Sequence, residues 1–101
     1  MDQTDPLFPV FLKLSGRRVV LVGGGAVATA KLSALLDAGA TVTVVAPQIT
    51  REIASSRVTI RQRMFEASDL NDAWLVVAAA PPSVNREVTK AAENRHLFVN
   101  A

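Results

Sequence analysis

The stretch RVVLVGGGAVA, residues 18–28, decides the fold of this 101-residue chain. Residues 18–22 are rich in valine, and such a short apolar run predicts a strand that is buried on both faces, as in a parallel sheet. Three consecutive glycines follow, after which the apolar period becomes that of a helix. We expect Gly39 to end this helix and the following side chains to share its buried face: Val27, Ala30, Ala34, Leu35 and Ala38.

The rest of the chain alternates between strand and helix patterns in the same way. Further strands are predicted at residues 41–45, 57–63, 73–79 and 97–100. Helical segments are predicted at residues 48–55, at 67–70 as a single turn, and from a cap at Ser83 through 92. This order predicts an α/β fold, a Rossmann-like doubly wound parallel sheet in a single domain spanning residues 1–101. The apolar residues 7–14 are either an edge strand or a packed lead-in.

Composition excludes several classes of protein. Half of the residues are hydrophobic and a fifth are charged, which is typical of a globular domain. The net charge of +2 gives no indication of a nucleic-acid partner, and the apolar run 73–82 is too short to span a membrane. The chain has no cysteine, which excludes disulfides and thiolate metal sites and suits the reducing cytoplasm, where we expect the protein. No other residue pattern indicates a metal site.

The glycines match a dinucleotide-binding pattern. Gly23-x-Gly25-x-x-Ala28 fits G-x-G-x-x-G/A, and it lies between a predicted strand and a predicted helix, as that motif requires. Gly23 would make the tight turn, Gly25 would let the backbone approach a pyrophosphate, and Ala28 would let the helix pack closely on the strand. Amides near Ala26 and Val27, helped by the helix dipole, would bind the anion. The expected cofactor is NAD.

The second predicted strand ends without the carboxylate that usually binds the adenosine ribose of NAD. Gln48 is the nearest substitute, so the preference between NAD and NADP stays open, and Arg51 is more simply read as an exposed helix residue. The ends of three predicted strands therefore contribute to the expected cofactor site: Gly23, Gly24, Gly25, Ala26, Val27, Ala46, Pro47, Gln48, Ala79 and Ala80.

Several segments together resemble the siroheme synthase family. They are residues 11–14, 18–28, Lys31, 35–40, 42–47, 75–79, 84–85 and 98–100. The resemblance implies an NAD-dependent precorrin-2 dehydrogenase, which converts the tetrapyrrole precorrin-2 into sirohydrochlorin in siroheme (porphyrin) biosynthesis. It also implies a homodimer, and in some members a second activity as sirohydrochlorin ferrochelatase.

The resemblance has two departures and one consequence. Ala30 stands where relatives often have arginine, and residues 79–82, Ala-Ala-Pro-Pro, stand where they tend to have polar side chains. The family's aspartate would follow Asn100 within a few residues, beyond Ala101. We therefore predict no catalytic residue here, and we expect the chain to be an inactive part of a longer enzyme without its dimerisation region and tail.

Other residues allow two readings each. Arg57, Arg61 and Arg63 share one face of the predicted strand 57–63, where they either attract a polycarboxylate tetrapyrrole or, as we favour, make a charged sheet edge. His96 is expected to be an exposed linker residue. Two alternatives to an enzyme domain remain at this point: an NAD(H)-sensing regulatory module without catalysis, and an interaction domain with a vacant glycine loop.

Overall fold

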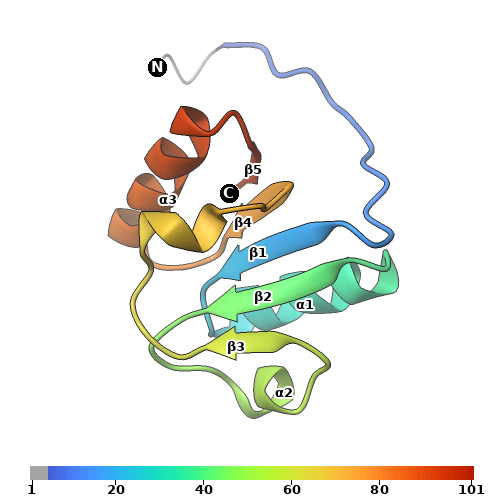
Figure 1. Ribbon diagram of the computed structural model, residues 1–101, viewed down its shortest axis with the longest axis vertical. Helices are drawn as coiled ribbons and strands as arrows, with labels where there is room; N and C mark the ends of the chain where they lie inside the picture. Colours follow the sequence, from blue (N-terminus) through green and yellow to red (C-terminus); the bar gives the residue numbers. More distant parts are fainter. Residues whose placement is uncertain (1–4) are drawn as a thin grey trace.

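The computed structural model describes residues 5–101 as a five-stranded parallel sheet with helices on both faces (Figure 1). The strands lie in the order β3-β2-β1-β4-β5. Their bounds are β1 Arg18–Val22, β2 Thr41–Val45, β3 Thr59–Arg61, β4 Leu75–Ala78 and β5 Phe98–Asn100. The chain winds outward from β1 in one direction and then returns to β4 on its other side, so the doubly wound α/β fold is confirmed.

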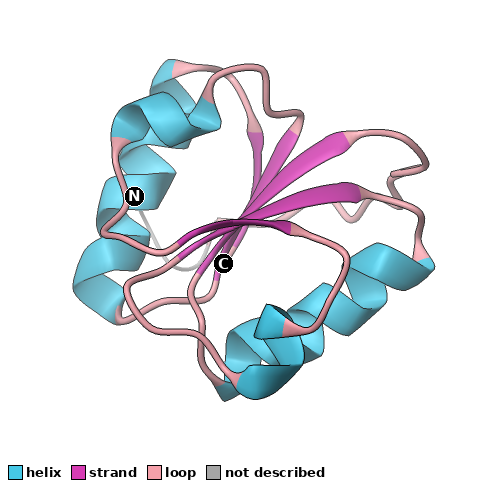
Figure 2. Ribbon diagram, turned by 60° about the horizontal axis from the view of Figure 1, so that its bottom comes forward, coloured by secondary structure: helices cyan, strands magenta, loops and turns pink. Residues whose placement is uncertain are grey.

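Helices α1 (Ala26–Asp37) and α2 (Arg51–Ala54) cover one face of the sheet. Helix α3 (Pro82–Asn94) and the single 3-10 turn η1 (Ala67–Leu70) cover the other face (Figure 2). Strand β1 contributes Val19 and Leu21 to the first layer and Val20 and Val22 to the second, and none of the four is more than 2% exposed. A strand buried on both faces is why its sequence is continuously apolar.

Several predicted boundaries are confirmed and others are wrong. Gly39 follows the end of α1 with a φ of +81°, as a C-terminal glycine should. Strand β3 has three residues instead of the predicted seven, because residues 56–58 bend, with the Val58 amide donating to the Ser56 carbonyl at 3.0 Å, and only Thr59–Arg61 pair with β2. Helix α3 begins at Pro82 and not after a Ser83 cap, since proline is preorganised for the first helical turn. Helix α2 and strand β4 are also shorter than predicted.

The predicted buried face of α1 is wrong by about one position. Its buried residues are Ala28, Leu32 and Leu35, so only Leu35 of the predicted five is confirmed, and Val27 is 61% exposed. The small Ala28 turns inward because it is the residue that meets the sheet where the helix begins. Residues 7–14 form neither an edge strand nor, apart from the buried Leu14 and partly buried Leu12, a packed lead-in. Within residues 5–101 we find no helix with the length and apolarity needed to cross a membrane.

Candidate functional site

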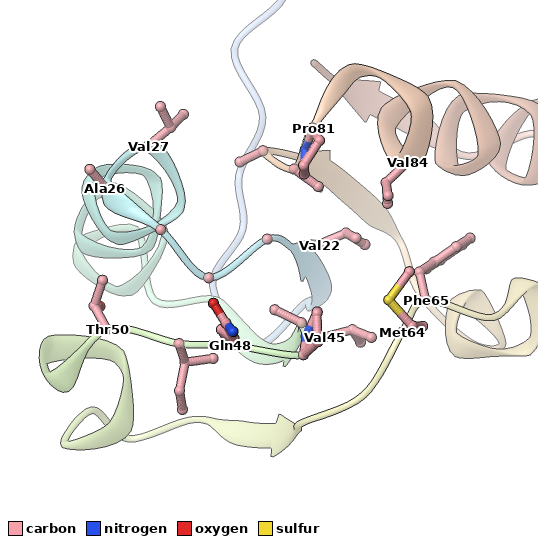
Figure 3. A pocket seen from close by; sticks show the side chains of 18 residues that line it. Val22, Ala26, Val27, Val45, Gln48, Thr50, Met64, Phe65, Pro81 and Val84 are labelled. Atoms are coloured by element: carbon pink, nitrogen blue, oxygen red, sulfur yellow. The ribbon is translucent and has the colours of Figure 1, made fainter.

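A cavity of about 690 Å³ opens at the carboxyl ends of β1, β2 and β4 (Figure 3). It lies beside the point where the winding of the sheet reverses, between β1 and β4. In open α/β sheets this is where ligands bind, because the loops that leave neighbouring strands diverge there. The lining consists of residues 22–27, 45–50, 64–65, 79–81 and 84.

Two of the three glycines are required by the protein itself. A Cβ at Gly23 would overlap the carbonyl oxygen of Ala79, and the φ of +132° at Gly23 is one that other residues rarely adopt. A Cβ at Gly24 would overlap the carbonyl oxygen of Gln48. The Gly23 amide donates to the Val45 carbonyl at 3.0 Å, so the loop after β1 is fitted against the two neighbouring loops by direct backbone approach.

Gly25 differs from both of these glycines. It has an ordinary φ of −92°, and a Cβ built there meets no protein atom within 4 Å. The packing of this protein therefore does not require a glycine at position 25. A side chain at this position would instead extend into open space bordering the cavity. Its absence leaves room for a ligand to reach the backbone.

The N-terminus of α1 presents free amides beside this open space. The first hydrogen bond of the helix is made by the amide of Thr29 to the carbonyl of Gly25, at 2.9 Å, which leaves the preceding amides of the first turn without a helical partner. No side chain caps Gly25, and the first turn carries no acidic residue. Free N–H groups and the positive end of the helix dipole together favour an anion here.

The described cavity lining carries no charged side chain. Only Gln48 and Thr50 are polar beyond the backbone. The Thr50 hydroxyl is already used, because it caps α2 and contacts the Thr29 hydroxyl at 2.8 Å. An anionic group in this cavity would thus be held by the backbone amides of the glycine loop and not by lysine or arginine. A dinucleotide fits such a site, since its pyrophosphate needs amides and its bases need apolar walls.

The loop after β4 is fixed by Asn85, which the sequence indicated only as part of the family resemblance and not as a site residue. Ala79 donates its amide to the Val22 carbonyl at 2.8 Å, and Ala80 donates to the side-chain oxygen of Asn85 at 2.9 Å. Asn85 lies in the first turn of α3 and substitutes for polar side chains within residues 79–82. The resulting turn presents Ala80 and Pro81 to the cavity.

The structure brings all ten predicted cofactor-site residues to the cavity lining. Sequence reasoning missed Met64 and Phe65, which follow β3, as well as Ile49, Thr50 and Val84. No local pattern marks Met64 and Phe65, because they reach the cavity only through the crossover from β3 to η1. Among the residues described, no group of three or more histidine, aspartate and glutamate side chains is placed to hold a metal ion.

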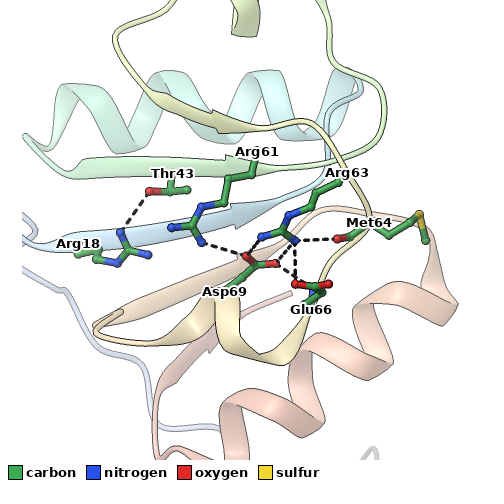
Figure 4. Close-up of polar contacts among 7 residues, drawn as sticks. All are labelled: Arg18, Thr43, Arg61, Arg63, Met64, Glu66 and Asp69. Atoms are coloured by element: carbon green, nitrogen blue, oxygen red, sulfur yellow. Dashed lines mark hydrogen bonds and ion pairs between the residues drawn. The ribbon is translucent and has the colours of Figure 1, made fainter.

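The arginines predicted to share a strand face are instead tied to a buried carboxylate. Asp69 is 1% exposed and accepts hydrogen bonds from Arg61 at 2.9 Å and from Arg63 at 2.5 and 2.9 Å (Figure 4). It also accepts from the amide of Glu66 at 2.8 Å. Burial alone would raise the pKa of Asp69, but the hydrogen bonds from Arg63, Glu66 and Arg61 outweigh it and lower the pKa below 3.8.

This cluster changes the interpretation of the arginines. The charges of Arg61 and Arg63 are balanced by Asp69 and by Glu66, which lies 3.6 Å from Arg63. Their paired charges argue against an attractive patch for a polycarboxylate, while β3 is an edge strand of the sheet, where Arg61 is partly exposed. Arg57 is exposed and lies outside β3. His96 is exposed, as predicted, and adopts a positive φ of 55° in the turn before β5.

Comparisons with known proteins agree with this geometry. The chain is 45% identical over 102 residues to the siroheme synthase of Xylella fastidiosa (strain M12), covering 95% of this chain and 21% of that protein. It is 41% identical over 97 residues to the siroheme synthase of Escherichia coli O157:H7 (strain EC4115 / EHEC), covering 91% and 21%. The chain thus spans about a fifth of the length of these curated relatives.

A solved structure and a family model extend the comparison. The structure of SirC, a precorrin-2 dehydrogenase, matches with a TM-score of 0.80 and 30% identity over 94% of this chain and 49% of that one. The resemblance to siroheme synthases inferred from the residues is therefore confirmed. Residues 10–101 match the family model described as "Putative NAD(P)-binding". With nearly the whole sequence matched and an uncharged cavity at its glycine loop, the chain belongs to this NAD(P)-binding family.

Proposed function

We propose that residues 1–101 are the NAD(P)-binding domain of a longer NAD-dependent oxidoreductase, a precorrin-2 dehydrogenase of siroheme biosynthesis. The observation that carries the proposal is Gly25, whose missing side chain serves no packing need of the protein and leaves space beside the free amides of α1. The siroheme synthase relatives and the SirC structure support the choice of reaction. They are named as enzymes, which favours this reading over a regulatory NAD(H) sensor.

The residues of this chain would divide the cofactor among three strand ends. The pyrophosphate fits against the amides of Ala26 and Val27, beside Gly25. The adenosine ribose fits near Gln48 at the end of β2, and the nicotinamide half fits toward Ala79 and Ala80 at the end of β4. When bound, NAD⁺ supplies the hydride acceptor, while the protein binds it, orients it and excludes water.

The longer enzyme would add what this domain does not provide. An apolar wall with no described titratable lining residue can hold a dinucleotide but gives no group for moving a proton. We propose that precorrin-2 binds against the open side of the cavity, and that the full-length enzyme is a cytoplasmic homodimer. The name of the SirC structure, a precorrin-2 dehydrogenase, supports the substrate. The homodimer follows from the family resemblance of the sequence, and the cytoplasmic location from its lack of cysteine.

Replacing Gly25 with valine tests the proposal. The new side chain points into open space, so the domain should fold normally, but it occupies the place where the pyrophosphate would approach the backbone. Calorimetric titration with NAD⁺ and with NADP⁺ should show at least about a hundredfold weaker binding, roughly 2.7 kcal/mol. The matched control is Ala30→Val, which adds a similar side chain to an exposed position of α1 outside the cavity. Equal affinity of the wild type and folded Gly25→Val would contradict the proposed site.

A further inference from the structure

We propose that the ion pair between Arg63 and Asp69 positions one wall of the dinucleotide cavity, and that Met64 on this wall contacts the adenosine half of the ligand. The inference rests on the proposed function and extends it to residues that neither the glycine pattern nor the family comparison identifies. The segment concerned is residues 62–66, which we call the strap. It connects the end of β3 with the start of η1 (Figure 4).

Asp69 is a buried carboxylate, and burying a charge lowers the stability of the fold unless the charge is fully paired. Its side chain accepts hydrogen bonds from both arginines and from the Glu66 amide, and it does not line the cavity. A binding role by direct contact is therefore excluded for Asp69. Its hydrogen bonds instead hold parts of the chain that border the cavity.

The side chains of Arg61 and Arg63 both donate to Asp69, but only that of Arg63 also donates to a backbone carbonyl of the strap. Its guanidinium donates a hydrogen bond of 3.0 Å to the carbonyl of Met64, in addition to those that it gives to Asp69. Arg61 is anchored independently, because it lies in β3 opposite Val45 and its carbonyl accepts from the Ala46 amide at 3.2 Å. Arg63 thus connects the buried carboxylate to the backbone of Met64, whereas Arg61 leaves that backbone untouched.

The strap needs such a side-chain anchor because it lies beyond the last ladder pair of the sheet, Val45 with Arg61. Phe65 packs against the core on the α3 face and holds one side of the strap. Met64 does not pack against the core. It is 60% exposed and lines the cavity, close to Val45 and Phe65 (Figure 3). The position of Met64 therefore depends on its backbone, and its backbone is held by Arg63.

The order of the strands indicates which half of the dinucleotide lies next to the strap. β3 is the neighbour of β2, so the strap lies on the β2 side of the glycine loop, where the adenosine half fits, and β4 lies on the nicotinamide side. A methionine thioether is an adaptable apolar surface that makes favourable contacts with aromatic rings. Met64 is thus placed to cover one face of the purine, opposite the lining residues that follow β2.

Paired arginine variants test the inference. Arg63→Gln removes the bond to Met64, while Arg61→Gln removes one guanidinium from the same carboxylate and serves as the matched control. If the freed strap holds its productive position about a tenth of the time, Arg63→Gln binds NAD⁺ and ADP-ribose about tenfold more weakly. Arg61→Gln should stay within about twofold, and Arg63→Gln should lose little further affinity in a Met64→Ala background, because Arg63 acts through Met64.

The NMR signal of the Met64 methyl group reports the position of this residue, and a change in the stability of the domain alone would not shift it. The chain has two methionines, Met1 and Met64, so ¹³C-methyl labelling isolates the wall residue after one assignment variant. We expect NAD⁺ to shift the Met64 methyl signal, and Arg63→Gln but not Arg61→Gln to displace it without ligand. Equal losses in the two variants, or a Met64 signal unmoved at saturating NAD⁺, would overturn the inference alone. If the wild type binds neither NAD⁺ nor NADP⁺, the proposed function is wrong, and this inference is wrong with it.

Discussion

The glycine loop and the strap border the same cavity, yet they are held in place by opposite means. Gly23 and Gly24 are fitted against the loops after β4 and β2 by backbone approach, without any charged group. The strap is held by Arg63 and the buried Asp69, through side chains that start several residues apart. One wall is therefore set by the shape of the backbone, and the other by ionised groups.

This difference predicts how folding and ligand binding respond to substitutions in each wall of the cavity. The close backbone contacts of the glycine loop leave no room for an added side-chain atom. Their stability does not depend on pH, because no titratable group takes part. A carboxylate held by two arginines tolerates small changes of shape but depends on ionisation. Changes at the glycine loop should therefore produce all-or-none effects on folding or binding. Changes in the Asp69 cluster should produce graded effects that vary with pH.

The largest effect is expected from Gly24→Ala. Its Cβ would overlap the Gln48 carbonyl, so the loops after β1 and β2 must separate, at a cost of about 3 kcal/mol in unfolding free energy. Gly25→Ala is the matched control, one residue away, and should change the unfolding free energy by less than about 1 kcal/mol. Urea unfolding of the three proteins measures both values. Similar losses in the two variants would mean that the glycines do not have separate roles.

A smaller effect, and one that depends on pH, is expected from Asp69→Asn. The variant leaves two arginines facing a neutral amide, and at pH 7 it should lower the unfolding free energy by about 2 kcal/mol. The folded-state pKa of Asp69 lies below the ordinary 3.8, so its stabilisation is complete above about pH 4 and is lost as the pH falls through the folded pKa.

The difference in unfolding free energy between the wild type and Asp69→Asn should therefore stay constant above about pH 4 and shrink as the pH falls through the lowered pKa of Asp69. Glu66→Gln serves as a control, because the Glu66 carboxylate is exposed and lies 3.6 Å from Arg63. A difference between the wild type and Asp69→Asn that persists unchanged into acid would show that the Asp69 charge does not stabilise the strap.

The smallest effect is expected at the β2 side of the cavity, from Gln48→Asp. Gln48 is exposed and lines the cavity, whereas Ala46, two residues earlier, is buried and unsuited to a carboxylate. An aspartate at position 48 should accept a ribose hydroxyl and repel a 2′-phosphate, shifting the ratio of NAD⁺ to NADP⁺ affinity about tenfold, or 1.4 kcal/mol. Competition titrations measure the ratio. An unchanged ratio in Gln48→Asp would place the ribose away from the end of β2.

The sequence by itself determined the parts of this protein that are local. Alternating strand and helix periods predicted the α/β fold. The glycine pattern and the ends of the two neighbouring predicted strands together supplied the ten predicted residues, all of which line the cavity. These signals are readable because a strand, a tight turn and the first turn of a helix are specified by neighbours in the chain. The motif assigned separate roles to Gly23 and Gly25, but only the structure shows that Gly24 is required by its approach to the Gln48 carbonyl.

The tertiary structure decided what depends on distant partners. The sequence predicted that Arg61 and Arg63 share a charged strand face and that Asp69 lies in a turn. The fold instead buries the Asp69 carboxylate and pairs it with the two arginines, which stay partly exposed. Whether a charge is solvated or paired depends on burial, which no window of sequence specifies for a short edge strand. For the same reason Met64 gave no signal, because a crossover and not a periodic pattern carries it to the cavity.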